Sequence, residues 1–112
     1  MRFMMVAALA VAAPVAMAQP AMPDFDPAAF CRRSLASIGH GESQFLLNGC
    51  LMQEQAAYDG LKARWPSIPE SAVRQCERSL RSIGISSYAL LQGCIQQEEA
   101  ARQQNQQFQF RR

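Results

Sequence analysis

Four cysteines are the residues of this chain whose type and spacing best suit chemistry. They are Cys31, Cys50, Cys76 and Cys94. The sequence has no Cys-x-x-Cys motif for thiol exchange, and long spacings without paired histidines do not fit a zinc site. We therefore predict that these cysteines form disulfides and that the chain has no metal site.

One histidine and two glutamates are the other candidates for chemistry. His40 is the only histidine and lies between two glycines in a predicted turn, where we expect it to be solvated. Nucleophilic catalysis needs a free cysteine or an activated serine beside a base, and the cysteines are expected to be consumed in disulfides. We predict that the chain is not an enzyme, has no catalytic residues and needs no cofactor.

Glu54 and Glu98 each follow the second cysteine of a pair by four residues. In an antiparallel pair of helices this position lies beside the start of the partner helix, at residues 27–28 for Glu54 and 71–72 for Glu98. A carboxylate there complements the positive end of the helix dipole and its free N–H groups. We therefore predict a structural role for both glutamates, rather than a catalytic or metal-binding one.

The cysteines belong to a sequence repeat. A first copy, residues 31–57, and a second copy, residues 76–101, are identical at about 16 of roughly 26 aligned positions. Each copy contains one pair of cysteines at matching places. The repeat predicts one supersecondary unit that occurs twice.

Signals for the start and end of helices also occur twice. An Asp-Pro start and an Ile-Gly end bound a predicted helix over residues 27–38. A second helix begins at residues 42–43 and ends at residue 65, before a proline. In the second copy, Gly84 ends one helix and a serine at 86–87 caps the next, with apolar residues at helical spacing in both.

The predicted fold is all-α, with four helices in two tandem antiparallel hairpins, hairpin 1 (residues 27–65) and hairpin 2 (residues 66–102). Residues equally far from the turn face each other in such a hairpin, so each hairpin is expected to contain its own disulfide. The predicted pairs are Cys31 with Cys50 and Cys76 with Cys94. Four cysteines allow three connectivities, and the sequence alone leaves the other two open. A loop of about twenty residues closed in this way contributes roughly 3 kcal/mol.

Residues 1–18 have the features of a signal peptide. Arg2 supplies the positive charge, residues 3–15 form an apolar run too short to span a bilayer, and residues 16–18 fit a signal-peptidase site. An amphipathic membrane anchor is the alternative. We predict a periplasmic or secreted protein without stable membrane insertion after cleavage, beginning with a flexible segment at residues 19–26.

Size and charge limit the classes of function. The chain has 112 residues, with 11 Lys and Arg against 9 Asp and Glu. The basic residues are scattered, whereas nucleic-acid binding favours a concentrated basic face. We expect one small domain that needs covalent stabilisation and does not bind nucleic acid.

Two groups of aromatic and aliphatic residues could contact a partner. One lies at the junction between the copies, where such residues also serve to pack one hairpin on the other. The second lies in a Gln-rich tail, residues 103–112, which has aromatic residues beside arginines, as interaction hot spots do, although termini are often disordered. The candidate partner-binding residues are Tyr58, Leu61, Trp65, Phe108 and Phe110.

Gly49 and Gly93 precede the second cysteine of each pair, within a predicted helix. Glycine costs about 1 kcal/mol relative to alanine there. The cost is explained if the two helix backbones approach closely beside the disulfide. A ligand lying against the glycine is the alternative.

Residues 65–101 resemble a motif of small exported bacterial proteins with four cysteines and helical hairpins. The motif has a tryptophan-proline start, two cysteines and a serine-tyrosine pair that opens the second helix. The matching residues are Trp65, Pro66, Ser67, Ile68, Arg74, Cys76, Ser87, Tyr88, Leu90, Leu91 and Cys94. The first copy has Ser43-Gln44 in place of the serine-tyrosine pair, and the resemblance implies no particular activity.

The sequence thus predicts a non-catalytic exported envelope protein. Its two disulfide-stapled hairpins are expected to present a helical surface to another envelope protein. The alternative is a periplasmic protein that binds a small apolar ligand or a metal in a groove beside Gly49 and Gly93.

Overall fold

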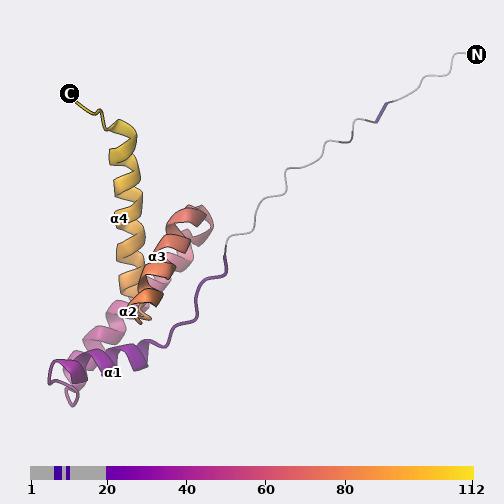
Figure 1. The fold of residues 1–112 in the computed structure, drawn as a ribbon. Helices are drawn as coiled ribbons and strands as arrows, with labels where there is room; N and C mark the ends of the chain where they lie inside the picture. Colours follow the sequence, from indigo (N-terminus) through magenta and orange to yellow (C-terminus); the bar gives the residue numbers. More distant parts are fainter. Residues whose placement is uncertain (1–6, 9, 11–19) are drawn as a thin grey trace, which may run out of the picture.

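A computed structural model describes residues 7–8, 10 and 20–112, so the predicted signal peptide lies almost entirely outside the described residues. All regular secondary structure in the described part is helical. The elements are α1 (Pro27–Ser37), α2 (Gln44–Arg64), a short 3₁₀ helix η1 (Trp65–Ser67), α3 (Glu70–Ser82) and α4 (Tyr88–Gln107). Figure 1 shows α1 at one end of the helical body and the end of α4 at the other. The predicted all-α fold is confirmed.

Local signals fix the ends of these helices. Asp26, Ser43 and Ser87 cap α1, α2 and α4, and each side chain accepts a hydrogen bond from the backbone N–H three residues later. Gly39 and Gly84 follow the ends of α1 and α3 with φ values of +81° and +69°. Glycine takes this left-handed conformation without steric cost, which explains both helix ends.

Each hairpin contains one disulfide, as predicted. The Cα atoms of Cys31 and Cys50 are 5.8 Å apart, and those of Cys76 and Cys94 are 5.7 Å apart. Helix α1 packs against α2, and α3 packs against α4. The two hairpins are therefore each cross-linked within themselves.

The main hydrophobic core lies between hairpin 2 and the second half of α2. Helix α2 has 21 residues and α1 has 11, so α2 extends beyond its own partner and packs against α4. The core residues are Ala57, Leu61, Trp65, Ile68, Val73, Cys76, Leu80, Tyr88, Leu91 and Ile95. Before residue 57, the buried apolar residues in the described part are Cys31 and Leu35. Helix α1 and the first half of α2 consequently project from the core.

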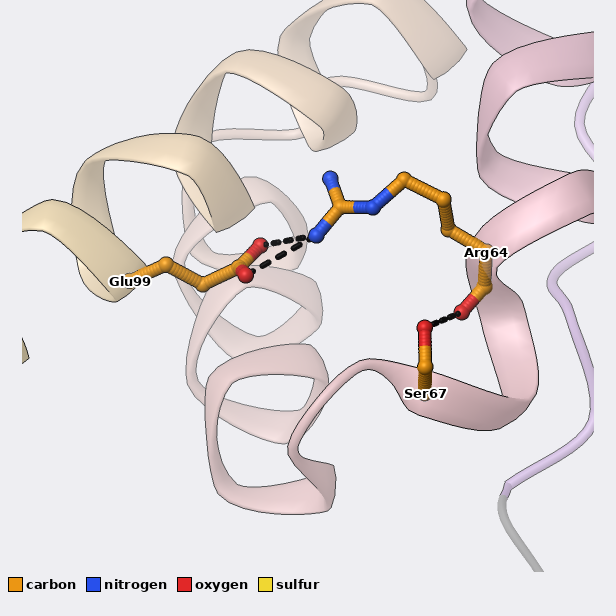
Figure 2. Close-up of polar contacts among 3 residues, drawn as sticks. All are labelled: Arg64, Ser67 and Glu99. Atoms are coloured by element: carbon orange, nitrogen blue, oxygen red, sulfur yellow. Dashed lines mark hydrogen bonds and ion pairs between the residues drawn. The ribbon is translucent and has the colours of Figure 1, made fainter.

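An ion pair joins α2 to α4 at the surface. One guanidinium nitrogen of Arg64 lies 2.9 Å from both carboxylate oxygens of Glu99, while the Ser67 hydroxyl donates to the Arg64 carbonyl at 2.8 Å (Figure 2). Both charged side chains are partly exposed, so the pair contributes at most about 1 kcal/mol. Burial in the core, rather than this ion pair, holds the hairpins together.

The segment before α1 is irregular and lies against the core. The Tyr88 hydroxyl accepts from the Phe25 N–H at 2.8 Å and donates to the Pro23 carbonyl at 2.9 Å. The Phe25 and Tyr88 ring centroids are 4.9 Å apart, and the Trp65 indole N–H donates to the Pro20 carbonyl at 2.6 Å. This attachment of the predicted flexible segment was not foreseen from the sequence.

None of the helices in the described part of the chain is long and apolar enough to cross a bilayer. Each of the four cysteines is paired, and two disulfides fit an oxidising compartment outside the cytoplasm.

Candidate interaction surface

Hairpin 1 exposes large apolar side chains on α2. Phe45 is 86% exposed and Met52 is 65% exposed. Residues 45, 48, 49 and 52 follow the i, i+3, i+4, i+7 pattern, so they lie on one side of the helix. We call this surface, made of Phe45, Asn48, Gly49 and Met52, the Phe45 face.

A groove of about 420 Å³ runs beside the Phe45 face. Leu35 of α1 and Leu46 of α2 line it, together with the side chains of the Phe45 face itself. From Ser43 to Gln53 the chain has no charged residue. An apolar surface without charge is typical of the centre of an interface and unusual for a solvated helix.

The second copy does not have these apolar residues. Ala89 aligns with Phe45, and Gln96 aligns with Met52. Hairpin 2 forms its helices and disulfide with these smaller or polar residues, so the hairpin fold does not require Phe45 or Met52. The difference between the two copies at these positions is the sequence signal for this surface. The sequence analysis used only the similarity of the copies and did not predict the Phe45 face.

The candidate residues at the junction belong to the core. Leu61 and Trp65 are 2% and 8% exposed, and Tyr58 packs edge-on against Tyr88 with ring centroids 5.0 Å apart. Leu61 and Trp65 are buried and Tyr58 is partly buried, which fits the alternative interpretation of this cluster as the packing contact between the hairpins. They pack one hairpin on the other, because α2 extends past α1 into the space beside hairpin 2.

Phe108 and Phe110 in the tail remain available to a partner. They are 71% and 74% exposed and follow the end of α4. The Arg112 guanidinium lies 5.7 Å from the centre of the Phe110 ring, a cation–π contact within the tail. The tail residues and the Phe45 face come from separate parts of the fold, so the structure does not gather the candidate residues into one site.

Glu54 lies at the start of a helix, but it is a different helix from the one predicted. It is 2% exposed, and its carboxylate accepts from the Ser87 hydroxyl at 2.5 Å, the Tyr88 N–H at 2.7 Å and the Ala89 N–H at 3.4 Å. These donors belong to the first turn of α4, whereas the prediction placed Glu54 beside the start of α1. Helix α2 packs against α4 as well as against α1, and the Glu54 carboxylate binds on the α4 side.

Glu98 has a different environment from Glu54. It is exposed and lines a groove with Pro69 and Ala72 at the start of α3, the level predicted for it. The two glutamates therefore occupy equivalent sequence positions but differ in burial and hydrogen bonding. One is an internal cap between the hairpins, and the other faces solvent.

The predicted close approach of helices at Gly49 and Gly93 is wrong. A Cβ placed on either glycine meets no atom within 4 Å. Each glycine precedes a disulfide cysteine, and one residue along an α-helix turns the side-chain direction by about 100°, away from the partner helix. A neighbouring helix contributes a side chain close to Gly60, where a Cβ would lie 2.7 Å from the side-chain amide nitrogen of Gln92 in α4.

The remaining candidates for chemistry are His40 and groups that could hold a metal ion. His40 is exposed in the turn of hairpin 1. No group of three or more His, Cys, Asp or Glu residues among the described ones is placed to hold a metal ion. The Phe45 face and its groove are the surface that we consider for function.

Comparisons with protein-family models, with curated proteins and with solved structures each found no significant match to this chain.

Proposed function

We propose that this chain is a non-catalytic, exported envelope protein that acts as a disulfide-stapled interaction module. Hairpin 2 and the second half of α2 supply the stable core. Hairpin 1, projecting from that core, presents the Phe45 face to a protein partner. Export to the periplasm or beyond is supported by the two disulfides and by the signal-like residues 1–18.

The observation that carries this proposal is the exposure of Phe45. A phenylalanine that is 86% exposed, beside a groove and within an uncharged stretch, costs solubility without stabilising the fold. The equivalent Ala89 shows that a hairpin of the same pattern forms without it. A contact surface explains the presence of this side chain, since burial of an aromatic ring contributes strongly to association.

Site-specific photo-crosslinking in the exporting cells tests the proposal. A benzophenone amino acid replaces Phe45 in one variant and Gln96, the residue in the second copy that aligns with Met52, in a matched control. We expect protein adducts from position 45 and none from position 96. Equal adducts from both positions, or none from position 45, would contradict the proposed role of the Phe45 face.

The groove beside Gly49 supports a second candidate function, the binding of a small apolar ligand. Its volume of about 420 Å³ falls within the range of small-molecule sites, and Gly49 places no side chain in it. Native mass spectrometry of protein taken from its own compartment distinguishes the two functions. If the groove binds a ligand, we expect a persistent added mass that is lost in a Leu46→Gln variant. If the chain is an interaction module, we expect the mass of the chain alone.

A further inference from the structure

We infer that the partner of the Phe45 face is a second copy of this chain, with the two α2 helices packed antiparallel across a two-fold axis. The inference rests on the proposed function, because it names the partner of the same surface. The evidence is the order of residues along the face, the chemistry of the residues that would meet, and the difference between the two copies of the repeat.

The Phe45 face is complementary to itself in an antiparallel pair. Phe45 and Met52 lie equally far from the midpoint between Asn48 and Gly49. A two-fold axis at that midpoint brings Phe45 of each copy level with Met52 of the other, and Asn48 level with Gly49. A two-fold interface requires this kind of match, since residue i must meet residue j and j must meet i.

The residues that meet in this arrangement are chemically compatible. A methionine sulfur beside an aromatic ring is a favourable contact, and the arrangement forms it twice. Gly49 presents no side chain, and a Cβ there would meet nothing within 4 Å inside the chain, so the space over it is open to the second helix. Since residues 43–53 have no charge, no like charges are brought together at the centre.

The exposed apolar surface sets the expected strength of the pair. Phe45 and Met52, with partly exposed Leu46, offer on the order of 300 Å² of apolar surface in each copy. With the polar groups at the rim, a pair buries roughly 1,000 Å² in total, near the lower limit for a specific interface. We therefore expect a weak, reversible dimer with a dissociation constant in the micromolar range.

The second copy of the repeat provides a variant that removes the face and keeps the hairpin. Phe45→Ala and Met52→Gln give hairpin 1 the residue types that hairpin 2 has at the aligned positions, Ala89 and Gln96. Both residues are mostly exposed, so the double variant is expected to keep the helical content and the disulfides of the unmodified chain. Circular dichroism and a thiol assay check this before any measurement of association.

Sedimentation equilibrium of the exported, fully oxidised chain, from about 1 µM to 1 mM, measures association. The unmodified chain should rise from the mass of one chain towards that of two. The double variant should keep the mass of one chain throughout, which corresponds to at least a tenfold loss of affinity. A Phe108→Ala/Phe110→Ala variant, which removes the other exposed aromatic pair, should behave like the unmodified chain.

Photo-crosslinking of the purified chain tests the antiparallel register. A benzophenone amino acid at position 45, in a mixture of isotopically heavy and light chains, should give heavy–light adducts on the peptide that contains Met52. Adducts on Phe108 or Phe110 would instead assign the face to the tail of a second copy and would overturn the inferred register.

The outcomes separate this inference from the proposed function. A purified chain that stays monomeric up to 1 mM, or a double variant that still dimerises, overturns self-pairing through the Phe45 face. If position 45 then still forms adducts with a different protein in cells, the proposed function holds and the inference of a second copy fails. If position 45 forms no adducts in either setting, both fail.

Discussion

Replacing Glu54 with glutamine is the sharpest test of how the two hairpins are joined. Its carboxylate, 2% exposed, receives the Ser87 hydroxyl and the Tyr88 and Ala89 N–H groups from the first turn of α4. Glutamine has almost the same shape, but it has one acceptor oxygen and an NH₂ group where Glu54 has two oxygens. The substitution therefore changes charge and hydrogen bonding at nearly constant packing.

The expected loss follows from this geometry. If the amide oxygen accepts from the Tyr88 N–H, the NH₂ group faces the Ser87 hydroxyl, which can rotate to accept, and the long bond from Ala89 is lost. Hydrogen bonds to a charged group contribute about 1.5 to 3 kcal/mol, and a carboxylate at a buried helix start up to about 2 kcal/mol. Relief from the desolvation of the carboxylate offsets part of this sum. We expect Glu54→Gln to lower the free energy of unfolding by about 1 to 3 kcal/mol, since these terms partly cancel.

Glu98→Gln is the matched control, because Glu98 occupies the aligned position in the second copy but is exposed. It should change the free energy of unfolding by less than about 0.5 kcal/mol. Urea unfolding followed by circular dichroism at neutral pH, with both disulfides intact, measures both variants. Equal effects of the two substitutions, or a stable Glu54→Gln variant, would refute the interpretation of Glu54 as a buried cap that joins the hairpins.

Four further variants probe the fold. Cys31→Ala/Cys50→Ala should cost about 2 to 4 kcal/mol and increase hydrogen exchange in α1 while the core of hairpin 2 stays protected. Gly93→Ala should raise stability by about 0.5 to 1 kcal/mol, because the new methyl meets nothing within 4 Å, whereas Gly84→Ala, at φ +69°, should lower it by about 1 to 2 kcal/mol. Urea unfolding measures the stability of both glycine variants. Tyr88→Phe removes two hydrogen bonds to the segment before α1 and should cost about 1 to 2 kcal/mol, with faster exchange of the Phe25 amide.

Local structure was predictable because its causes are local. The caps at Asp26, Ser43 and Ser87 and the left-handed glycines act within one or two helical turns, so their signals can be read from short stretches of sequence. The disulfide pairing follows from the predicted helix ends, because two helices joined by a short turn pack antiparallel and bring their cysteines to the same level. The four helices and both disulfides could therefore be predicted without knowledge of how the hairpins pack.

The arrangement of one hairpin on the other was not predictable in this way. The prediction placed Glu54 beside the start of α1 because it considered contacts within one hairpin, whereas the carboxylate binds the start of α4. The sequence gives the two helix lengths, but the neighbour of the unpaired half of α2 depends on contacts between residues more than thirty positions apart, such as Glu54 with Ser87. Identical local patterns in the two copies thus lead to different environments, one glutamate buried and the other exposed.

The same asymmetry determines how copies of this chain can associate. The core uses Leu61 of α2 and Trp65 of η1, but continuing the repeat alignment places Asn105 and Gln109 at these positions after the second copy. The polar residues at the end of α4 therefore offer no counterpart to the contact that Leu61 and Trp65 make with hairpin 2. In the proposed dimer, in contrast, the Phe45 face of each copy is buried in the two-fold interface and is not available to a third copy. Association through this face therefore closes at two copies, and the mass should not exceed that of a dimer as the protein concentration rises.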